Sequence, residues 1–170
     1  MKLPAPIRAP ARRLLTRILG RDPATARPVQ VAALPWRRSA AGGIEILLVT
    51  SRSSNRWLVP KGWPMRRRTL AEAAAREAYE EAGVEGRIEA RPIGRFDHVK
   101  NHPLLGRLRC TVFLFPLAVA TELDPWQEKG QRSRRWYDRA AAAGKVASPD
   151  LARLIREFEP EPVDRARPGA

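Results

Sequence analysis

The sequence predicts an α/β fold in which helices pack on a mixed β-sheet. Short apolar segments bounded by turn residues indicate strands along most of the chain, and two segments combine a capping residue with apolar residues at helical spacing. The expected order is three strands, a helix, three more strands and a final helix, with antiparallel connections. The chain has 170 residues, of which 44% are hydrophobic, so it can bury the core of one domain.

The first part of the chain predicts three strands. Residues 29–37 and 44–52 are apolar runs joined by the glycine-containing segment 39–43, which is typical of a hairpin. Residues 57–59 predict a short third strand that leads directly into a Pro/Gly loop.

A helix is predicted after this loop. Thr69 is a suitable N-cap, Glu72 occupies the capping-box position and Gly83 is a typical helix stop. A stripe of small residues at helical spacing is expected along it, formed by Ala71, Ala74, Ala75, Ala78 and Ala82. The segment is therefore predicted to be one helix with a narrow alanine face.

The second part of the chain predicts three strands and a final helix. Strands are expected at residues 87–95, 108–119 and 133–137, with a polar loop at residues 97–106 between the first two. The last helix is expected at residues 149–158, where a serine and a proline favour a helix start.

The composition divides the chain into three segments. Residues 1–27 are a basic N-terminal extension, residues 28–159 are the expected domain, and residues 160–170 are a proline-rich tail that is expected to be disordered. The extension alternates arginine with isoleucine and leucine, but its apolar patches are too short for a secretory signal. Two interpretations stay open: contact with an anionic membrane surface or ligand, or an arm that is mobile or packs on the domain.

The net charge of +14 favours anionic partners such as polyphosphates, nucleotides, nucleic acids or a membrane surface. No helix-turn-helix, zinc or RNA-recognition motif is present, so no specific nucleic-acid partner is expected. No apolar run approaches the roughly 18 residues of a membrane span, so no transmembrane segment is expected. The single cysteine, Cys110, fits a reducing cytoplasm, the expected location. The sequence indicates no oligomeric state.

Three glutamates lie on one turn of the predicted helix. Glu77, Glu80 and Glu81 share a face because residues three and four apart are neighbours on a helix. Like charges this close repel one another unless a cation lies among them. Oxygen ligands suit a hard divalent cation, Mg²⁺ or Mn²⁺, better than zinc. The alternative is a solvated acidic face on which Arg76 pairs with Glu80.

The spacing around these glutamates resembles the signature of the Nudix hydrolases. That signature is a glycine followed at a fixed distance by R-E-U-x-E-E-x-G-U, where U is apolar, and it is matched here by Gly62 and residues 76–84. The resemblance covers about residues 28–158 and implies an α/β/α sandwich with a mixed sheet. Residues 47–52 and 56–62 further resemble the branch that contains the diphosphoinositol polyphosphate and diadenosine polyphosphate hydrolases.

The resemblance implies a role for each charged residue of the helix. Glu77 and Glu81 would be metal ligands, and Glu80 would be the general base or a further ligand. Arg76 would brace the glutamates by ion pairing. The metal would be Mg²⁺ or Mn²⁺, which screens phosphate oxygens and lowers the pKa of water.

The resemblance also implies residues that bind substrate, a small nucleoside or inositol polyphosphate. Arg52 and Lys61 match positions beside the substrate in relatives, and a backbone carbonyl near Lys61 or Gly62 would complete the metal shell. Some relatives take a base or ligand from the loop that holds Glu128, where a surface acid is the alternative. His98 could reach substrate from its predicted loop, where a solvated histidine is the alternative.

One position departs from the family pattern. Arg68 stands where the usual glutamate occurs six residues after the glycine, and an arginine cannot ligate a cation. Three interpretations are open. The missing glutamate is dispensable for activity, or Arg68 binds phosphate with its neighbours Arg66 and Arg67, or the domain has lost catalysis and binds a nucleotide-like ligand.

Overall fold

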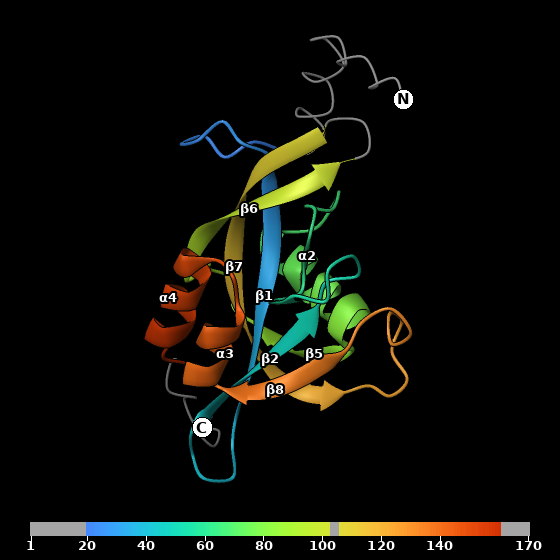
Figure 1. The fold of residues 1–170 in the computed structure, drawn as a ribbon, viewed down its shortest axis with the longest axis vertical. Helices are drawn as coiled ribbons and strands as arrows, with labels where there is room; N and C mark the ends of the chain where they lie inside the picture. Colours follow the sequence, from blue (N-terminus) through green and yellow to red (C-terminus); the bar gives the residue numbers. More distant parts are fainter. Residues whose placement is uncertain (1–19, 103–105, 161–170) are drawn as a thin grey trace, which may run out of the picture.

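The computed structural model describes residues 20–102 and 106–160, which form a β-sheet with helices on both faces (Figure 1). In chain order the elements are β1 Val29–Arg38, β2 Ile44–Thr50, β3 Trp57–Leu58, β4 Lys61–Gly62, α2 Leu70–Glu77, the π-helix η1 Ala78–Ala82, β5 Val84–Ile88, β6 Gly94–His102, β7 Gly106–Glu122, β8 Arg134–Asp138, α3 Arg139–Lys145 and α4 Pro149–Glu157.

Strand β1 lies at the centre of the sheet. It pairs antiparallel with β2 and β4 and parallel with β7. The long strand β7 also pairs antiparallel with β5 and β6, and β2 pairs with β3 and β8. The parallel pair among antiparallel ones makes the sheet mixed, as predicted. Because helices cover both faces of β1, its apolar run is buried along most of its length.

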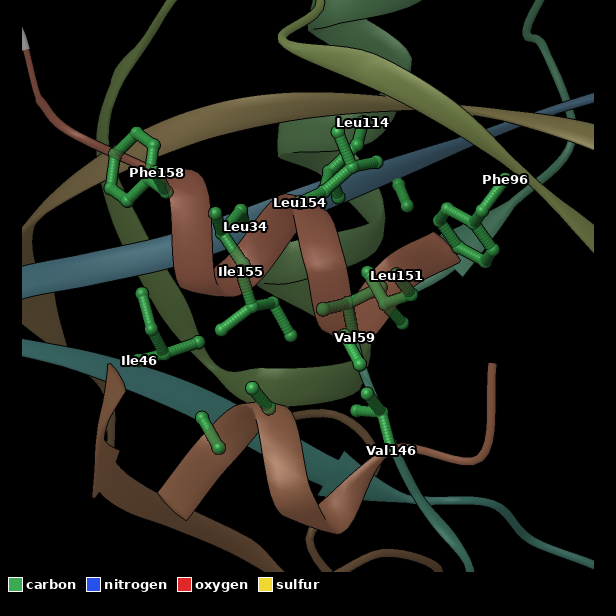
Figure 2. Packing of buried hydrophobic residues seen from close by; sticks show 14 of the residues in the cluster. Leu34, Ile46, Val59, Phe96, Leu114, Val146, Leu151, Leu154, Ile155 and Phe158 are labelled. Carbon is green, nitrogen blue, oxygen red and sulfur yellow. The ribbon is translucent and has the colours of Figure 1, made fainter. Parts of the chain in front are cut away.

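The two faces of the sheet carry separate hydrophobic cores. Helices α3 and α4 pack over one face, where Leu34 and Leu114 of the sheet meet Leu151 and Ile155 of α4 (Figure 2). On the other face, α2 and η1 pack through small alanine side chains against β1, β2 and β7. Figure 1 shows the two helical layers on opposite sides of the sheet, so the predicted α/β/α sandwich is confirmed.

The helix of the predicted signature begins and ends as expected but changes its winding. Thr69 and Glu72 form the capping box at the start of α2, and Gly83 ends η1 with a positive φ of 61°. Between them the chain passes from α-helix to a π-helical turn after Glu77. Four alanines of the predicted stripe are buried, Ala75 is half-buried, and Ala73 outside the stripe is buried as well.

The prediction for the segment after the helix is wrong in two places. The strand predicted at residues 87–95 is two separate strands, since β5 ends at Ile88 and β6 begins at Gly94. The polar loop predicted at residues 97–106 is mostly strand, because β6 pairs with β7 along its whole length. Backbone hydrogen bonds to β7 hold these polar residues in a strand. Because their side chains do not alternate between apolar and polar, the sequence gives no sign of this strand.

Two short elements were not predicted. Strand β4 has only two residues, which is too short for any pattern. Helix α3 follows Asp138, whose side chain accepts a hydrogen bond from the backbone of Ala141 at 2.8 Å. The apolar residues of α3 are alanines, so its sequence shows no clear amphipathic pattern.

Residues 20–27, assigned from sequence to the basic extension, contact the domain. The Asp22 side chain is 3% exposed and accepts hydrogen bonds from the Thr25 hydroxyl at 2.7 Å and from Arg95 at 3.2 Å. The Thr25 hydroxyl also lies 3.0 Å from that of Thr111 on β7. This turn is therefore fixed against the β6–β7 hairpin.

The rest of the predicted extension, residues 1–19, and the predicted disordered tail, residues 161–170, lie outside the described residues. Within the part of the chain that the structure describes, no helix is both long enough and apolar enough to cross a membrane.

Candidate active site

Strand β4 brings the glycine of the signature against the helix. It pairs with β1 through Val31↔Gly62 and Ala32↔Lys61, so Gly62 faces the side of the sheet that α2 covers. A Cβ at Gly62 would lie 1.9 Å from Oε1 of Glu77. Glycine is therefore needed at this position because the carboxylate lies directly on the strand backbone.

Glu81 is buried, whereas the other two glutamates of the turn are half-buried. Its Oε2 accepts a hydrogen bond from the backbone N–H of Lys61 at 3.1 Å, and its Oε1 accepts one from Arg132. Its main-chain carbonyl accepts a hydrogen bond from the indole N–H of Trp126 at 3.2 Å. These contacts hold both the side chain and the helix turn in place.

Arg76 pairs with Glu80, as the helical spacing predicts. Its Nε donates to Oε1 of Glu80 at 2.5 Å, and its guanidinium lies 4.9 Å from the centroid of the Tyr79 ring. The main-chain carbonyl of Glu80 accepts a hydrogen bond from the N–H of Glu128 at 3.2 Å. Arg76 therefore positions Glu80 and not all three glutamates.

The Glu77 carboxylate has neither a hydrogen bond nor an ion pair with any described residue. Burial, followed by repulsion from Glu81, Glu80 and Glu128, raises the pKa of Glu77 to about 7. Burial also raises the pKa of Glu81, against the opposing charge of Arg132. An unpaired carboxylate among like charges in a half-buried place favours the uptake of a proton or a cation.

The chemistry of these side chains fits a hard divalent cation. Carboxylate oxygens are the ligands that Mg²⁺ and Mn²⁺ prefer, and Glu77 and Glu81 are the residues that would hold the ion, with Glu80 beside them. Among the described residues, no three His, Cys, Asp or Glu side chains are placed so that together they could hold a metal ion. Since Arg132 contacts one oxygen of Glu81, metal binding requires these side chains to move.

The segment between β7 and β8 lies over the glutamates and contributes a residue that sequence reasoning did not single out. The Arg132 side chain is 6% exposed and forms ion pairs with Glu81 and Glu128. It also donates to the carbonyl of Thr50 at 2.9 Å. Arg132 is one of several basic residues in this segment, and the sequence does not distinguish it from the others. Its partners are known only from the folded structure.

The same segment also brings Arg52 to the edge of the site. Arg52 donates to the side chain of Gln131 at 3.2 Å and lies 3.7 Å from Glu128. The Glu128 side chain is 14% exposed, so it is part of this ionic network and not a solvated surface acid.

Lys61 contributes to both faces of the sheet. Its backbone N–H binds Glu81, whereas its side chain, opposite Ala32, points to the face that α3 and α4 cover. Burial there lowers the pKa of Lys61 to about 8, with Lys100 and Arg132 adding to the effect and Glu81 opposing it.

His98 is in strand β6 and not in a loop. It pairs with Cys110 of β7 and is half-buried. Burial, followed by the charges of Lys61 and Lys100, lowers the pKa of His98 to about 4, so the imidazole is neutral at neutral pH.

Arg68 is exposed, two residues before the start of α2. It lines an open groove of about 420 Å³ beside α2, together with Glu72, Arg76 and Tyr79.

Of the site residues predicted from sequence, the structure brings the helix glutamates, Arg76, Lys61 and Gly62 together, with Arg52 at the edge. It gives Arg68 no hydrogen bond or ion pair with those glutamates in the described part of the chain. The role of Arg68 in substrate binding stays a prediction.

Comparison with known proteins identifies the family. The NUDIX domain model matches residues 26–158 of this chain. The chain belongs to the Nudix family.

Nudix hydrolase 12, mitochondrial, of Arabidopsis thaliana is 34% identical over 121 residues, which cover 68% of this chain and 58% of that protein. Diphosphoinositol polyphosphate phosphohydrolase 3-alpha of Mus musculus is 34% identical over 96 residues, which cover 55% of this chain and 54% of that protein. The chain thus spans little more than half the length of these curated relatives.

Solved Nudix structures share the fold. A binary complex of the C. elegans Ap4A hydrolase has a TM-score of 0.56 at 20% identity, covering 75% of this chain and 92% of that one. The NUDIX domain of Shewanella oneidensis NrtR, complexed with ADP ribose, has a TM-score of 0.52 at 17% identity, covering 88% and 98%. At these identities the similarity establishes the Nudix fold alone.

Replacing Gly62 by alanine is predicted to displace Glu77. The added methyl group would overlap the carboxylate, so we expect Gly62→Ala to weaken Mg²⁺ binding roughly 10- to 100-fold by isothermal titration calorimetry. Gly130→Ala is the matched control, since nothing lies within 4 Å of the position that its Cβ would take. Equal Mg²⁺ affinity in both variants would contradict the close contact.

His98 predicts a pH dependence of stability. Its pKa of about 4 in the folded state lies below the ordinary 6.5, so the unfolded chain binds more protons between these values. The contribution of neutral His98 is therefore present above pH 6.5 and is lost as the pH falls toward 4. Calorimetric melting across this range should show a smaller loss of stability for His98→Gln than for the wild type. Parallel curves would refute the prediction.

Proposed function

We propose that the chain is a divalent-metal-dependent hydrolase that cleaves a phosphoanhydride bond in a small-molecule polyphosphate. The observation that carries the proposal is the convergence of Glu77, Glu80 and Glu81 beside the backbone of Lys61 and Gly62. Membership of the Nudix family supports it, because the similar proteins are named as hydrolases and phosphohydrolases. The location proposed is a reducing cytoplasm, in keeping with the free, buried thiol of Cys110.

The residues divide the chemistry among them. Mg²⁺ or Mn²⁺ held by Glu77 and Glu81 supplies positive charge that offsets the substrate phosphates and makes water more acidic. Glu80 lies on the same turn with 26% of its side chain exposed, and it is the proposed general base. Arg76 holds the Glu80 carboxylate in position through its ion pair.

Cations around the carboxylates bind the phosphates. Arg52 is more than half exposed at the edge of the site, so it is free to contact phosphate. The side chain of Lys61 lies on the other face of β4 from the carboxylates, so its ammonium group is proposed to meet phosphates that extend past this strand. Arg132 is buried and already paired with Glu81 and Glu128, so its proposed role is to offset the charge of these carboxylates.

The proposed substrate is a diadenosine polyphosphate or a diphosphoinositol polyphosphate. One similar curated protein is named for diphosphoinositol polyphosphate, and similar solved structures are titled Ap4A hydrolase. Both compounds carry many phosphates, and the net charge of +14 suits either.

A second candidate function is a catalytically weakened Nudix module that binds a nucleotide-like ligand. Arg68 replaces the family's usual glutamate and lines the groove beside α2 instead of joining the carboxylates. With one acidic ligand fewer, the site would hold metal less firmly.

Hydrolysis should be detected in a substrate panel with Mg²⁺ or Mn²⁺. The panel contains diadenosine polyphosphates, nucleotide sugars, nucleoside triphosphates and diphosphoinositol polyphosphates. Glu81→Gln removes a charge and an oxygen ligand, so it is expected to lower kcat roughly 100-fold or more. The matched control is Glu45→Gln, because Glu45 pairs with Arg37 on the neighbouring strand and has no place in the site. If the wild type turns over nothing faster than Glu81→Gln, the hydrolase proposal fails for this panel.

Substitution of Arg68 by glutamate separates the two candidate functions. Because Arg68 forms no hydrogen bond or ion pair with the three glutamates in the described part of the chain, we expect Arg68→Glu to leave both kcat and Mg²⁺ affinity close to the wild-type values. A large gain in Mg²⁺ affinity would instead favour the weakened module, and loss of turnover would show that Arg68 holds substrate. Calorimetric titration with Mg²⁺ and steady-state kinetics distinguish these results.

A further inference from the structure

Gln30 is a fully buried polar side chain in the central strand of the sheet. It lies in β1 with 0% of its surface exposed, and neither Oε1 nor Nε2 has a hydrogen-bond partner among the described residues. A buried amide gives up its hydrogen bonds to water, so leaving both of its atoms unpaired is unfavourable. Such a group calls for a partner that the described protein atoms do not supply, either a buried water or a bound molecule.

Gln30 lies on the face of the sheet that α3 and α4 cover. It is opposite Val112 in the parallel pair of β1 and β7, and Val112 belongs to the core of that face. Ala32, two residues after Gln30 in β1, pairs with Lys61. Cys110, two residues before Val112 in β7, pairs with His98. Since side chains two apart in a strand share a face, Gln30 lies between Lys61 and His98.

Other polar and aromatic groups surround this position. We refer to Gln30, Lys61, Trp63, His98 and Lys100 as the Gln30 cluster. The ammonium of Lys100 lies 5.0 Å from the centroid of the Trp63 ring, and Lys61 and Lys100 both act on the charge of His98. Gln30 is buried, whereas the other four side chains are half-buried. The cluster thus has a buried polar centre within a partly accessible edge.

The Gln30 cluster borders the carboxylates. The backbone of Lys61 binds Glu81, and the charge of Lys100 acts on Glu77. A molecule whose phosphates lie at these glutamates therefore reaches the Gln30 cluster when it extends past the two lysines.

We propose that Gln30 is a specificity-determining residue that hydrogen-bonds the nucleobase of a nucleoside polyphosphate substrate. The inference rests on the proposed hydrolase function and selects one of its two substrate types. A glutamine amide offers a donor and an acceptor in one plane, which match the adjacent donor and acceptor on a base edge. The neutral imidazole of His98 adds a further donor or acceptor, and Trp63 offers a ring for stacking.

A diphosphoinositol polyphosphate is a poorer match for this centre. Its ring is surrounded by phosphate oxygens, which are mainly acceptors and carry a dense negative charge. Nε2 of Gln30 could donate to a phosphate oxygen, but Oε1 would be left facing acceptors. A site built to hydrogen-bond a neutral group discriminates against a molecule that leaves its buried polar atoms unpaired.

The test compares Gln30→Met with the wild type in metal-free binding. Methionine keeps a similar length and volume but removes both amide atoms. By isothermal titration calorimetry, we expect the variant to bind AMP about 10- to 100-fold more weakly, with binding of inositol hexakisphosphate unchanged. Gln127→Met is the matched control because Gln127 is exposed, and its AMP affinity should equal that of the wild type. Calorimetric melting should show that Gln30→Met is at least as stable as the wild type.

Hydrolysis provides a second measurement. The ratio of kcat/KM for diadenosine tetraphosphate to that for diphosphoinositol pentakisphosphate should exceed one in the wild type and fall in Gln30→Met. Equal AMP affinity in variant and wild type would overturn the proposal. Equal weakening toward AMP and inositol hexakisphosphate would also overturn it. If no substrate is hydrolysed, the proposed function fails, while the AMP titration still decides the role of Gln30.

Discussion

The contact between Gly62 and Glu77 is the constraint on which the rest of the site depends. Strand β4 is only two residues long, and its pairing with β1 fixes Gly62 against the helix layer. Because Gly62 has no side chain and α2 packs through alanines, the carboxylate of Glu77 lies on the strand backbone. The same approach brings the N–H of Lys61 to Glu81 at 3.1 Å. A larger residue on either side would separate the helix from the strand.

This close packing has an electrostatic cost. Three carboxylates lie within one turn in a place partly removed from water, where repulsion is stronger than at the surface. Arg76 and Arg132 offset the charges of Glu80 and Glu81, whereas Glu77 has no such partner among the described residues and its pKa rises to about 7. Burial of apolar side chains in the two hydrophobic cores offsets this repulsion in the folded state. Functional sites commonly contain such locally unfavourable charges.

The parts of the fold and site that could be predicted are those that local sequence determines. Thr69 and Gly83 act within a few residues of the helix ends, so the signature helix and its glutamates were placed correctly. Strand β6 depends on pairing with β7 and shows no apolar alternation, so it was missed. Arg132 contacts Glu81 from 51 residues away. That Gln30 is buried without a hydrogen-bond partner among the described residues is visible only once the sheet is assembled. Long-range contacts leave no local pattern.

The two residues of β4 also connect the carboxylates with the Gln30 cluster. Side chains alternate along a strand, so Gly62 faces α2 and the glutamates while the Lys61 side chain faces His98 and the other core. A register shift of one residue would exchange these faces and place the lysine side chain against Glu77. Pairing of β4 with β1 therefore fixes the carboxylates and the side chains around Gln30 relative to each other. In the proposed function, this single strand pair would set the distance along the substrate from the cleaved bond to the recognised base.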